Sequence, residues 1–187
     1  MMALRKDVQN WPIVTACAGR MKEIKKALFD RMPPLWRHIL VLWGIATIPA
    51  LIIGAVTNAV AFLLEAPPPN FGSQHSDQWI SAFQSIAFAP FVETLLLCAL
   101  IEISTSLGVR KIFIAASAAA IAGLLHAFIT LIWFFTSAWA FFVYACAYLA
   151  WRSASFSEAF AAAAVVHALN NATGVAMLFL IALTKSS

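Results

Sequence analysis

The sequence predicts an all-α protein, a polytopic bundle of about five transmembrane helices preceded by an amphipathic helix at the membrane surface. Of the 187 residues, 63% are hydrophobic and 11% are charged, whereas soluble globular chains are about 45–50% apolar and about 25% charged. Five apolar runs divide the chain, and basic residues gather at alternate ends of these runs. Because the three Cys form no framework, a disulfide-stapled scaffold is excluded. The composition also excludes an ordinary soluble domain, a disordered chain and a nucleic-acid-binding module.

Residues 1–38 form a basic segment that we expect on the cytoplasmic side. The segment holds eight of the twelve basic residues and three acids. It has no apolar run long enough for a signal-peptide core, so we expect an uncleaved anchor. Between residues 19 and 32, apolar side chains share one helix face, opposite three lysines: Met21, Ile24, Leu28 and Met32 against Lys22, Lys25 and Lys26. This pattern predicts a helix lying on an anionic membrane surface; the alternative is a solvated tail.

The transmembrane bundle is expected over residues 39–187, with one span for each apolar run. The runs are 39–64, 79–107, 112–134, 137–151 and 157–182. All but the fourth are long enough to cross about 30 Å of hydrocarbon at about 1.5 Å per residue. The fourth is short, because we expect a turn near Thr136 and Ser137. The second is longer than needed and contains Pro90, so we expect it to tilt or break.

The loops between the expected spans carry basic residues on one side only. With the N-terminus in the cytoplasm, Arg110, Lys111 and Arg152 fall in cytoplasmic loops, and Lys185 falls outside. Eleven of the twelve basic residues are then cytoplasmic, as the positive-inside rule requires. A topology with four or six spans breaks this alternation, so the charges favour five.

Four polar side chains are expected at a common depth in the bundle. Glu93 lies in the second run, His126 in the third, and His167 and Asn171 in the fifth. Their distances from the cytoplasmic span ends correspond to roughly 15–21 Å at 1.5 Å per residue. An ionisable group this deep costs about 2.5–3.5 kcal/mol on insertion scales, so it needs a reason to be there. His167 and Asn171 share a helix face one turn apart, and we therefore predict a common reactive site.

Each polar residue also has a purely structural interpretation. A single His can hydrogen-bond a carbonyl, a single Glu can be a protonated packing residue, and an Asn can join two helices. Asn170 lies off the face of His167, and Glu102 lies near the cytoplasmic surface, so we predict structural roles for both. His38 and His75 have no partner in the sequence. The set of four is much harder to explain by packing alone.

The residues around these four positions form three motifs. They are Ala89-Pro90-Phe91-Val92-Glu93-Thr94, Gly123-Leu124-Leu125-His126-Ala127 and His167-Ala168-Leu169-Asn170-Asn171. In order and spacing they resemble the motifs of the CPBP family (CAAX-processing and bacteriocin-processing, or Abi, intramembrane proteases), over about residues 79–175. That family has Glu-Glu-x-x-x-Arg, then a His on the next span, then His-x-x-x-Asn two spans later. Thr94 stands here for the second Glu, Cys98 for the Arg, and Ala122 for a usually aromatic residue.

The resemblance implies a glutamate-type intramembrane protease of a bacterial inner membrane that acts on a membrane-anchored protein or peptide. Glu93 would be the general base on a water molecule, and His126 would orient that water or share its proton. His167 and the Asn171 carboxamide would donate to the oxyanion. No cofactor is implied. One Glu and two His could bind zinc, but Asn171 is a poor zinc ligand and the family is glutamate-type, so no metal is expected.

Two other classes of function stay open from the sequence. Thr94 and Cys98 are compatible with a non-catalytic CPBP-like membrane protein, such as an immunity or scaffold factor. Buried Glu and His residues also form proton relays in carriers, although five spans without repeat symmetry argue against a carrier. We expect no nucleic-acid partner.

Overall fold

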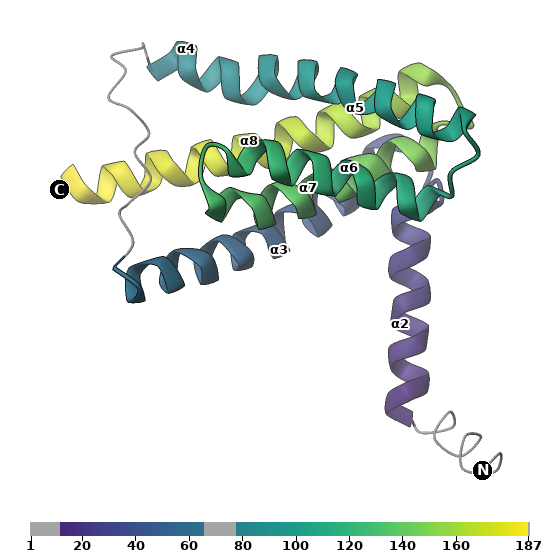
Figure 1. Ribbon diagram of the computed structural model, residues 1–187, viewed down its shortest axis with the longest axis horizontal. Helices are drawn as coiled ribbons and strands as arrows, with labels where there is room; N and C mark the ends of the chain where they lie inside the picture. The colour runs from purple at the N-terminus through teal and green to yellow at the C-terminus, as the bar shows by residue number, and fades with distance from the viewer. Residues whose placement is uncertain (1–11, 66–77, 187) are drawn as a thin grey trace.

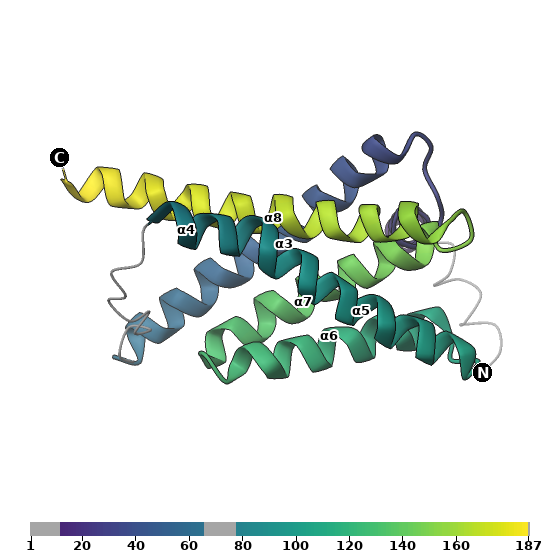
Figure 2. The ribbon, with the colours of Figure 1, turned by 90° about the horizontal axis from the view of Figure 1, so that it is seen from above.

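The computed structural model describes residues 12–65 and 78–186, and every regular element within them is a helix. The helices are α2 (Pro12–Phe29), α3 (Leu35–Leu63), α4 (Gln78–Phe83), the π-helical turn η1 (Gln84–Phe88), α5 (Ala89–Ser106), α6 (Lys111–Ala127), α7 (Leu131–Trp151) and α8 (Phe156–Ser186). The longer helices lie side by side along one axis, in alternating directions (Figures 1 and 2). The α2 helix points away from one end of this bundle (Figure 1).

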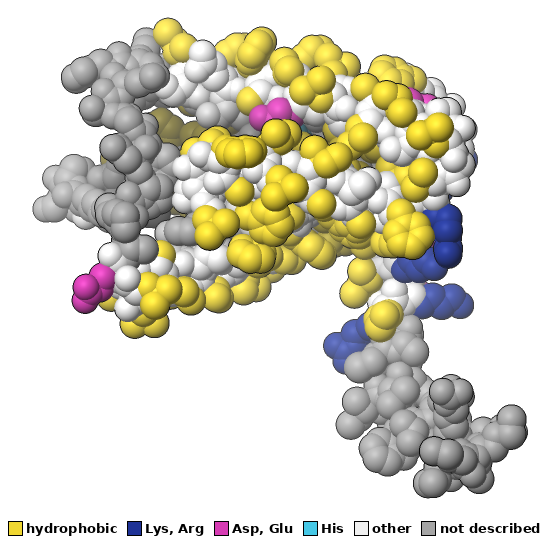
Figure 3. All heavy atoms as spheres, in the orientation of Figure 1, with side chains coloured by type: hydrophobic (Ala, Val, Ile, Leu, Met, Phe, Trp, Pro, Cys, Tyr) yellow, Lys and Arg dark blue, Asp and Glu magenta, His cyan; other side chains and the backbone are white. Residues whose placement is uncertain are grey.

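Four helical segments are long and apolar enough to cross a membrane, as expected of an integral membrane protein. They are Leu35–Leu63, Ile80–Ser106, Trp133–Trp151 and Phe156–Leu180. One more apolar helix, α6, has only 17 residues, which corresponds to a length of about 25 Å. Large apolar side chains cover the flank of the bundle in Figure 3, whereas Lys and Arg gather at the end from which α2 projects.

The predicted turn near Thr136 and Ser137 is wrong. Both residues lie inside α7, and the connection between α6 and α7 is residues 128–130. The third apolar helix is therefore the short one, not the fourth. Along the bundle axis, this connection does not reach as far as the C-terminal ends of α3 and α8 (Figures 1 and 2). Its Phe128 and Ile129 are exposed and apolar, so the sequence offers no polar signal for this turn.

The helix α7 is the centre of the bundle. It packs against α2, α3, α5, α6 and α8, and nearly every side chain from Ala140 to Trp151 is buried. Small residues on α6 let this helix approach α7 closely. A Cβ on Gly123 would lie 3.0 Å from Ala138 Cβ and 3.0 Å from the Phe134 carbonyl oxygen. The α6–α7 hairpin therefore depends on the missing side chain at Gly123.

Replacing Gly123 by alanine is expected to destabilise the bundle by about 1–3 kcal/mol, because the added methyl group would overpack a contact that includes backbone. Unfolding of the purified protein in detergent measures this effect. Gly174→Ala in α8 is the matched control, since a Cβ there meets nothing within 4 Å. Equal stability of the two variants would contradict close packing of α6 on α7.

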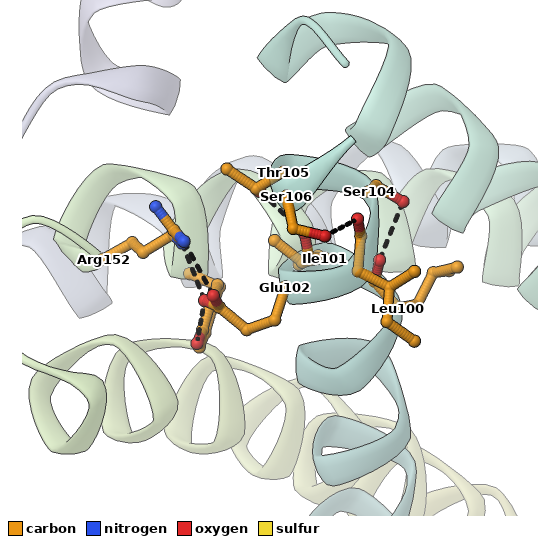
Figure 4. A network of polar contacts seen from close by, with 9 residues as sticks. Leu100, Ile101, Glu102, Ser104, Thr105, Ser106 and Arg152 are labelled. Carbon is orange, nitrogen blue, oxygen red and sulfur yellow. Dashed lines mark hydrogen bonds and ion pairs between the residues drawn. The ribbon is translucent and has the colours of Figure 1, made fainter. Parts of the chain in front are cut away.

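Two polar clusters fasten the end of the bundle near α2. Glu102 accepts two hydrogen bonds from Arg152, both 2.7 Å, and one from the Tyr148 hydroxyl at 2.8 Å (Figure 4). This gives Glu102 the predicted structural role, joining α5 to α7. His38 is fully buried: its Nδ1 accepts from Trp151 Nε1 at 2.7 Å, and its Nε2 is 2.7 Å from the Ala27 carbonyl. His38 thus joins α2, α3 and α7, partners that the sequence does not reveal.

The expected break at Pro90 takes the form of the π-helical turn η1 within a continuous helix from residue 78 to 106. In this turn the Ala89 amide donates to the Gln84 carbonyl, five residues earlier. The same pattern would pair residue 90 with the Ser85 carbonyl, but proline has no N–H. The Ser85 carbonyl instead accepts a 2.9 Å hydrogen bond from Asn171 Nδ2. Asn171 therefore satisfies a backbone acceptor that Pro90 leaves open.

Candidate active site

Glu93 and His167 are neighbours in the interior of the bundle. Glu93 Oε2 on α5 lies 3.6 Å from His167 Nε2 on α8. The imidazole is almost completely buried, at 3% exposure, and the carboxylate is about one-third exposed, at 34%. Although these residues are 74 positions apart in the sequence, the packing of α5 against α8 brings them together. At this separation the two atoms lie just beyond direct hydrogen-bond reach of about 2.6–3.2 Å, so an acid and an imidazole placed in this way exchange a proton through a shared water or after a small approach.

Three side chains hold the His167 ring. The Thr94 Oγ1 is 3.4 Å from His167 Nδ1, and the Tyr144 ring stacks on the imidazole with centroids 4.4 Å apart. Phe141 approaches the ring edge-on at 5.2 Å. When the Thr94 hydroxyl donates to Nδ1, the neutral ring carries its proton on Nε2, on the side of Glu93. In this tautomer His167 is a donor toward the carboxylate; in the other tautomer Nδ1 donates to Thr94 instead.

His126 lies on the other side of Phe141, at the last turn of α6. Its Nδ1 is 2.8 Å from the Ala122 carbonyl, so Nδ1 carries a proton and donates there, and Nε2 is left to act as an acceptor. The centroid of its ring is 5.6 Å from that of Phe141. Phe141 therefore contacts both imidazoles.

Glu93 and His126 line the same cavity of about 440 Å³. The rest of its wall is apolar and comes from α5, α6 and α7: Leu96, Leu97, Leu100, Ala118, Ile121, Ala122, Leu125, Ile129 and Phe141. Leu96, Leu125 and Ile129 are more than 60% exposed, so the cavity opens on the flank of the bundle between α5 and α6. An apolar cavity with few polar groups suits a ligand that arrives from within the membrane.

Asn171 is the predicted site residue whose side chain is bonded outside the site: its amide nitrogen donates to the Ser85 carbonyl. Like His167, it does not line the cavity that Glu93 and His126 share. It still lies one turn from His167 on the same helix, as its spacing predicts. The neighbouring Asn170 accepts a 2.9 Å hydrogen bond from Thr47 of α3, which fits the structural role predicted for Asn170.

Two residues around His167 were not predicted. Thr94 was interpreted only as a departure from the family motif, yet it is fully buried and its hydroxyl faces His167. Tyr144 is 1% exposed, and its hydroxyl has no hydrogen-bond partner among the residues that the structure describes. Tyr144 sits within an apolar run like any packing aromatic, so no sequence signal distinguishes it.

Within residues 12–65 and 78–186, no three His, Cys, Asp or Glu side chains are placed so that they could hold a metal ion together. Cys98 and Cys146 are free and buried. A comparison with protein-family models, curated proteins and solved structures found no match for this chain.

Proposed function

We propose that the protein is a glutamate-type intramembrane endopeptidase, similar to the CPBP family, that hydrolyses a peptide bond of a membrane-anchored protein or peptide. The observation that carries the proposal is the Glu93–His167 pair, 3.6 Å apart in the bundle interior, beside an apolar cavity that Glu93 and His126 line. These residues lie on three different helices; His167 is buried, and Glu93 and His126 are half-buried. A packing role alone does not require three ionisable groups on three helices, two of them lining one apolar cavity.

The chemical step uses one water and the scissile amide. Glu93 takes a proton from the water, the oxygen attacks the carbonyl carbon, and a tetrahedral oxyanion forms. The C–N bond then breaks, and the proton held by Glu93 passes to the leaving nitrogen. His126, with Nε2 free to accept, orients the water or shares its proton. The products are a carboxylic acid and an amine, which become a carboxylate and an ammonium group when the proton passes from one to the other, so atoms and charge balance.

The oxyanion needs hydrogen-bond donors near the carbonyl. His167 Nε2 faces Glu93 and is one donor, and the Asn171 carboxamide is the other in this proposal. For Asn171 to act, its amide must leave or share the Ser85 carbonyl when the substrate binds. One donor of this kind is typically worth about 2.7–4 kcal/mol of the barrier.

Asn171→Ala is therefore expected to lower turnover about 10²–10³-fold while the protein stays folded. The control is Asn170→Ala on the same helix, which removes a hydrogen bond to Thr47 but no group of the proposed site. Cleavage of a membrane-anchored peptide by the detergent-purified protein measures both variants. Equal turnover of Asn171→Ala and the wild type would show that Asn171 has only a structural role, through its hydrogen bond to the Ser85 carbonyl.

The location follows from the charges and the apolar helices. We place the chain in a bacterial inner membrane with its N-terminus in the cytoplasm, and we place the basic segment 1–38 on the anionic leaflet. Residues 1–11 of this segment lie outside the described part of the chain. In the described part, Met21 and Ile24 of α2 are exposed together with its lysines, as suits a helix in the membrane interface.

One observation favours a second candidate, a non-catalytic CPBP-like membrane protein such as an immunity or scaffold factor. The bond from Asn171 to Ser85 gives this residue a complete structural role, and Thr94 and Cys98, which stand for the Glu and the Arg of the family motif, are buried. The two candidates differ in what a double variant does in cells. A Glu93→Gln/His126→Ala protein that restores the phenotype of a deletion strain supports the non-catalytic function; failure to restore it supports the protease.

A further inference from the structure

A small cavity lies at the end of the bundle from which α2 projects. It measures about 250 Å³ and has walls from two segments, Lys25, Phe29 and Asp30 at the end of α2 and Arg110, Lys111 and Ile112 at the start of α6. Its α2 wall is fixed to the bundle. His38 bonds the Ala27 carbonyl, and the Phe29 ring packs edge-on against Phe142 of α7 at 6.5 Å.

The cavity is strongly cationic for its size. Three of its six lining side chains are basic and one is acidic, and among the residues described none of the three basic groups forms an ion pair. Helix α6 also begins here, with no side-chain cap at its first turn, and the positive end of the helix dipole adds to the field. The Arg110 guanidinium lies over the Phe113 ring at 5.9 Å, but without ion-pair partners the three cations around this cavity repel one another, and an anion bound between them relieves that repulsion.

The position of the cavity favours a lipid over a dissolved anion. The cavity lies at the end of the bundle from which α2 projects, and at that end Figure 3 shows Lys and Arg side chains next to the apolar flank. Headgroups meet a membrane protein at such helix ends. Phe29 and Ile112 give it an apolar wall beside the cations, which matches a phosphate attached to a glycerol backbone. A water takes about 30 Å³ of liquid, so the volume is ample for a phosphate group.

We propose that this cavity, which we call the α2–α6 pocket, binds the phosphate of one anionic phospholipid. Lys25, Arg110 and Lys111 contact the phosphate oxygens, Asp30 limits the affinity, and the acyl chains lie along the apolar flank. The bound lipid joins α2 to the α5–α6 connection, two segments whose contact is otherwise only the rim of the pocket. This site is independent of Glu93 and of the proposed hydrolysis.

Native mass spectrometry of the detergent-purified full chain, titrated with phosphatidylglycerol, tests the proposal. We expect one lipid bound per protein with clear preference, and weaker binding of zwitterionic phosphatidylcholine. Near the membrane surface one cation contributes about fivefold in affinity, so Arg110→Gln/Lys111→Gln should weaken phosphatidylglycerol binding about 20-fold. The control Arg20→Gln/Lys22→Gln removes the same charge from exposed positions of α2 outside the pocket and should weaken it much less.

A variant that binds phosphatidylglycerol more tightly than the wild type cannot be explained by misfolding. Asp30→Asn deletes the only acid of the pocket and should tighten phosphatidylglycerol binding about fivefold. Equal weakening by both double variants, or no gain of affinity in Asp30→Asn, would contradict lipid binding in the α2–α6 pocket. The binding would then reflect non-specific electrostatic attraction to the basic surface. Inorganic phosphate or glycerol phosphate binding as tightly as phosphatidylglycerol would instead identify a soluble phosphate compound as the occupant and overturn the lipid.

Discussion

Glu93→Gln is expected to lower the rate of peptide-bond cleavage by about 10²–10⁴-fold, the range that a positioned general base contributes. Glutamine has nearly the same size as glutamate and can still lie beside His167, so the packing of α5 on α8 is kept. The amide, however, cannot take a proton from water at neutral pH. The measurement is turnover of a membrane-anchored peptide by purified wild-type and variant proteins in the same detergent.

A matched substitution separates chemistry from general damage. Glu65→Gln removes a carboxylate from the end of α3, far along the bundle from the cavity, and should leave turnover unchanged. Thermal unfolding of both variants shows whether each is folded. Cleavage by Glu93→Gln at the wild-type rate would remove the catalytic role of Glu93, and with it the proposed mechanism.

The second large effect is expected at His167, where glutamine should lower turnover about 10²–10³-fold through loss of a donor beside the reacting oxygen. Because the imidazole is almost fully buried against Tyr144 and Phe141, this substitution also costs stability. A graded variant therefore accompanies it. Thr94→Val keeps the volume of residue 94 but removes the hydroxyl that faces His167 Nδ1.

We expect Thr94→Val to lower kcat about tenfold with little change in KM, because a misplaced His167 ring would donate less well to the oxyanion, which exists only at the transition state and the intermediate. Thr94→Ser, which restores the hydroxyl, should recover most of that loss. Stability of the variants is measured in parallel. Wild-type kcat in both Thr94→Val and His167→Gln would show that the imidazole only fills space.

The sequence predicts the apolar helices well because burial in lipid demands long apolar runs. The helices α3 and α8 begin within four residues of the predicted spans 39–64 and 157–182. The α6–α7 turn was misplaced because a turn at mid-bundle needs no polar residues, and Phe128 and Ile129 therefore look like part of a span. The amphipathic helix was predicted over residues 19–32, whereas α2 runs from Pro12 to Phe29, so Met32 lies beyond its end; its position on the membrane surface stays a prediction.

The candidate site is predictable where spacing alone places the residues. His167 and Asn171 share a face because they are four apart, and the common depth of Glu93 and His167 follows from counting residues along antiparallel helices. What each polar atom contacts cannot be read from spacing. The bond from Asn171 to Ser85 depends on a π-helical turn that the missing N–H of Pro90 makes favourable, and Thr94 reaches His167 only through the packing of α5 on α8.

The most direct test of the account is the coupling between Glu93 and His167. Turnover is measured for Glu93→Gln, for His167→Gln and for the double variant, each checked for folding by thermal unfolding. Residues that act as one catalytic unit have strongly non-additive effects, so we predict that the double variant is no slower than the slower single variant. Independent effects that multiply, or a double variant that cleaves at the wild-type rate, would contradict a shared catalytic role for this pair.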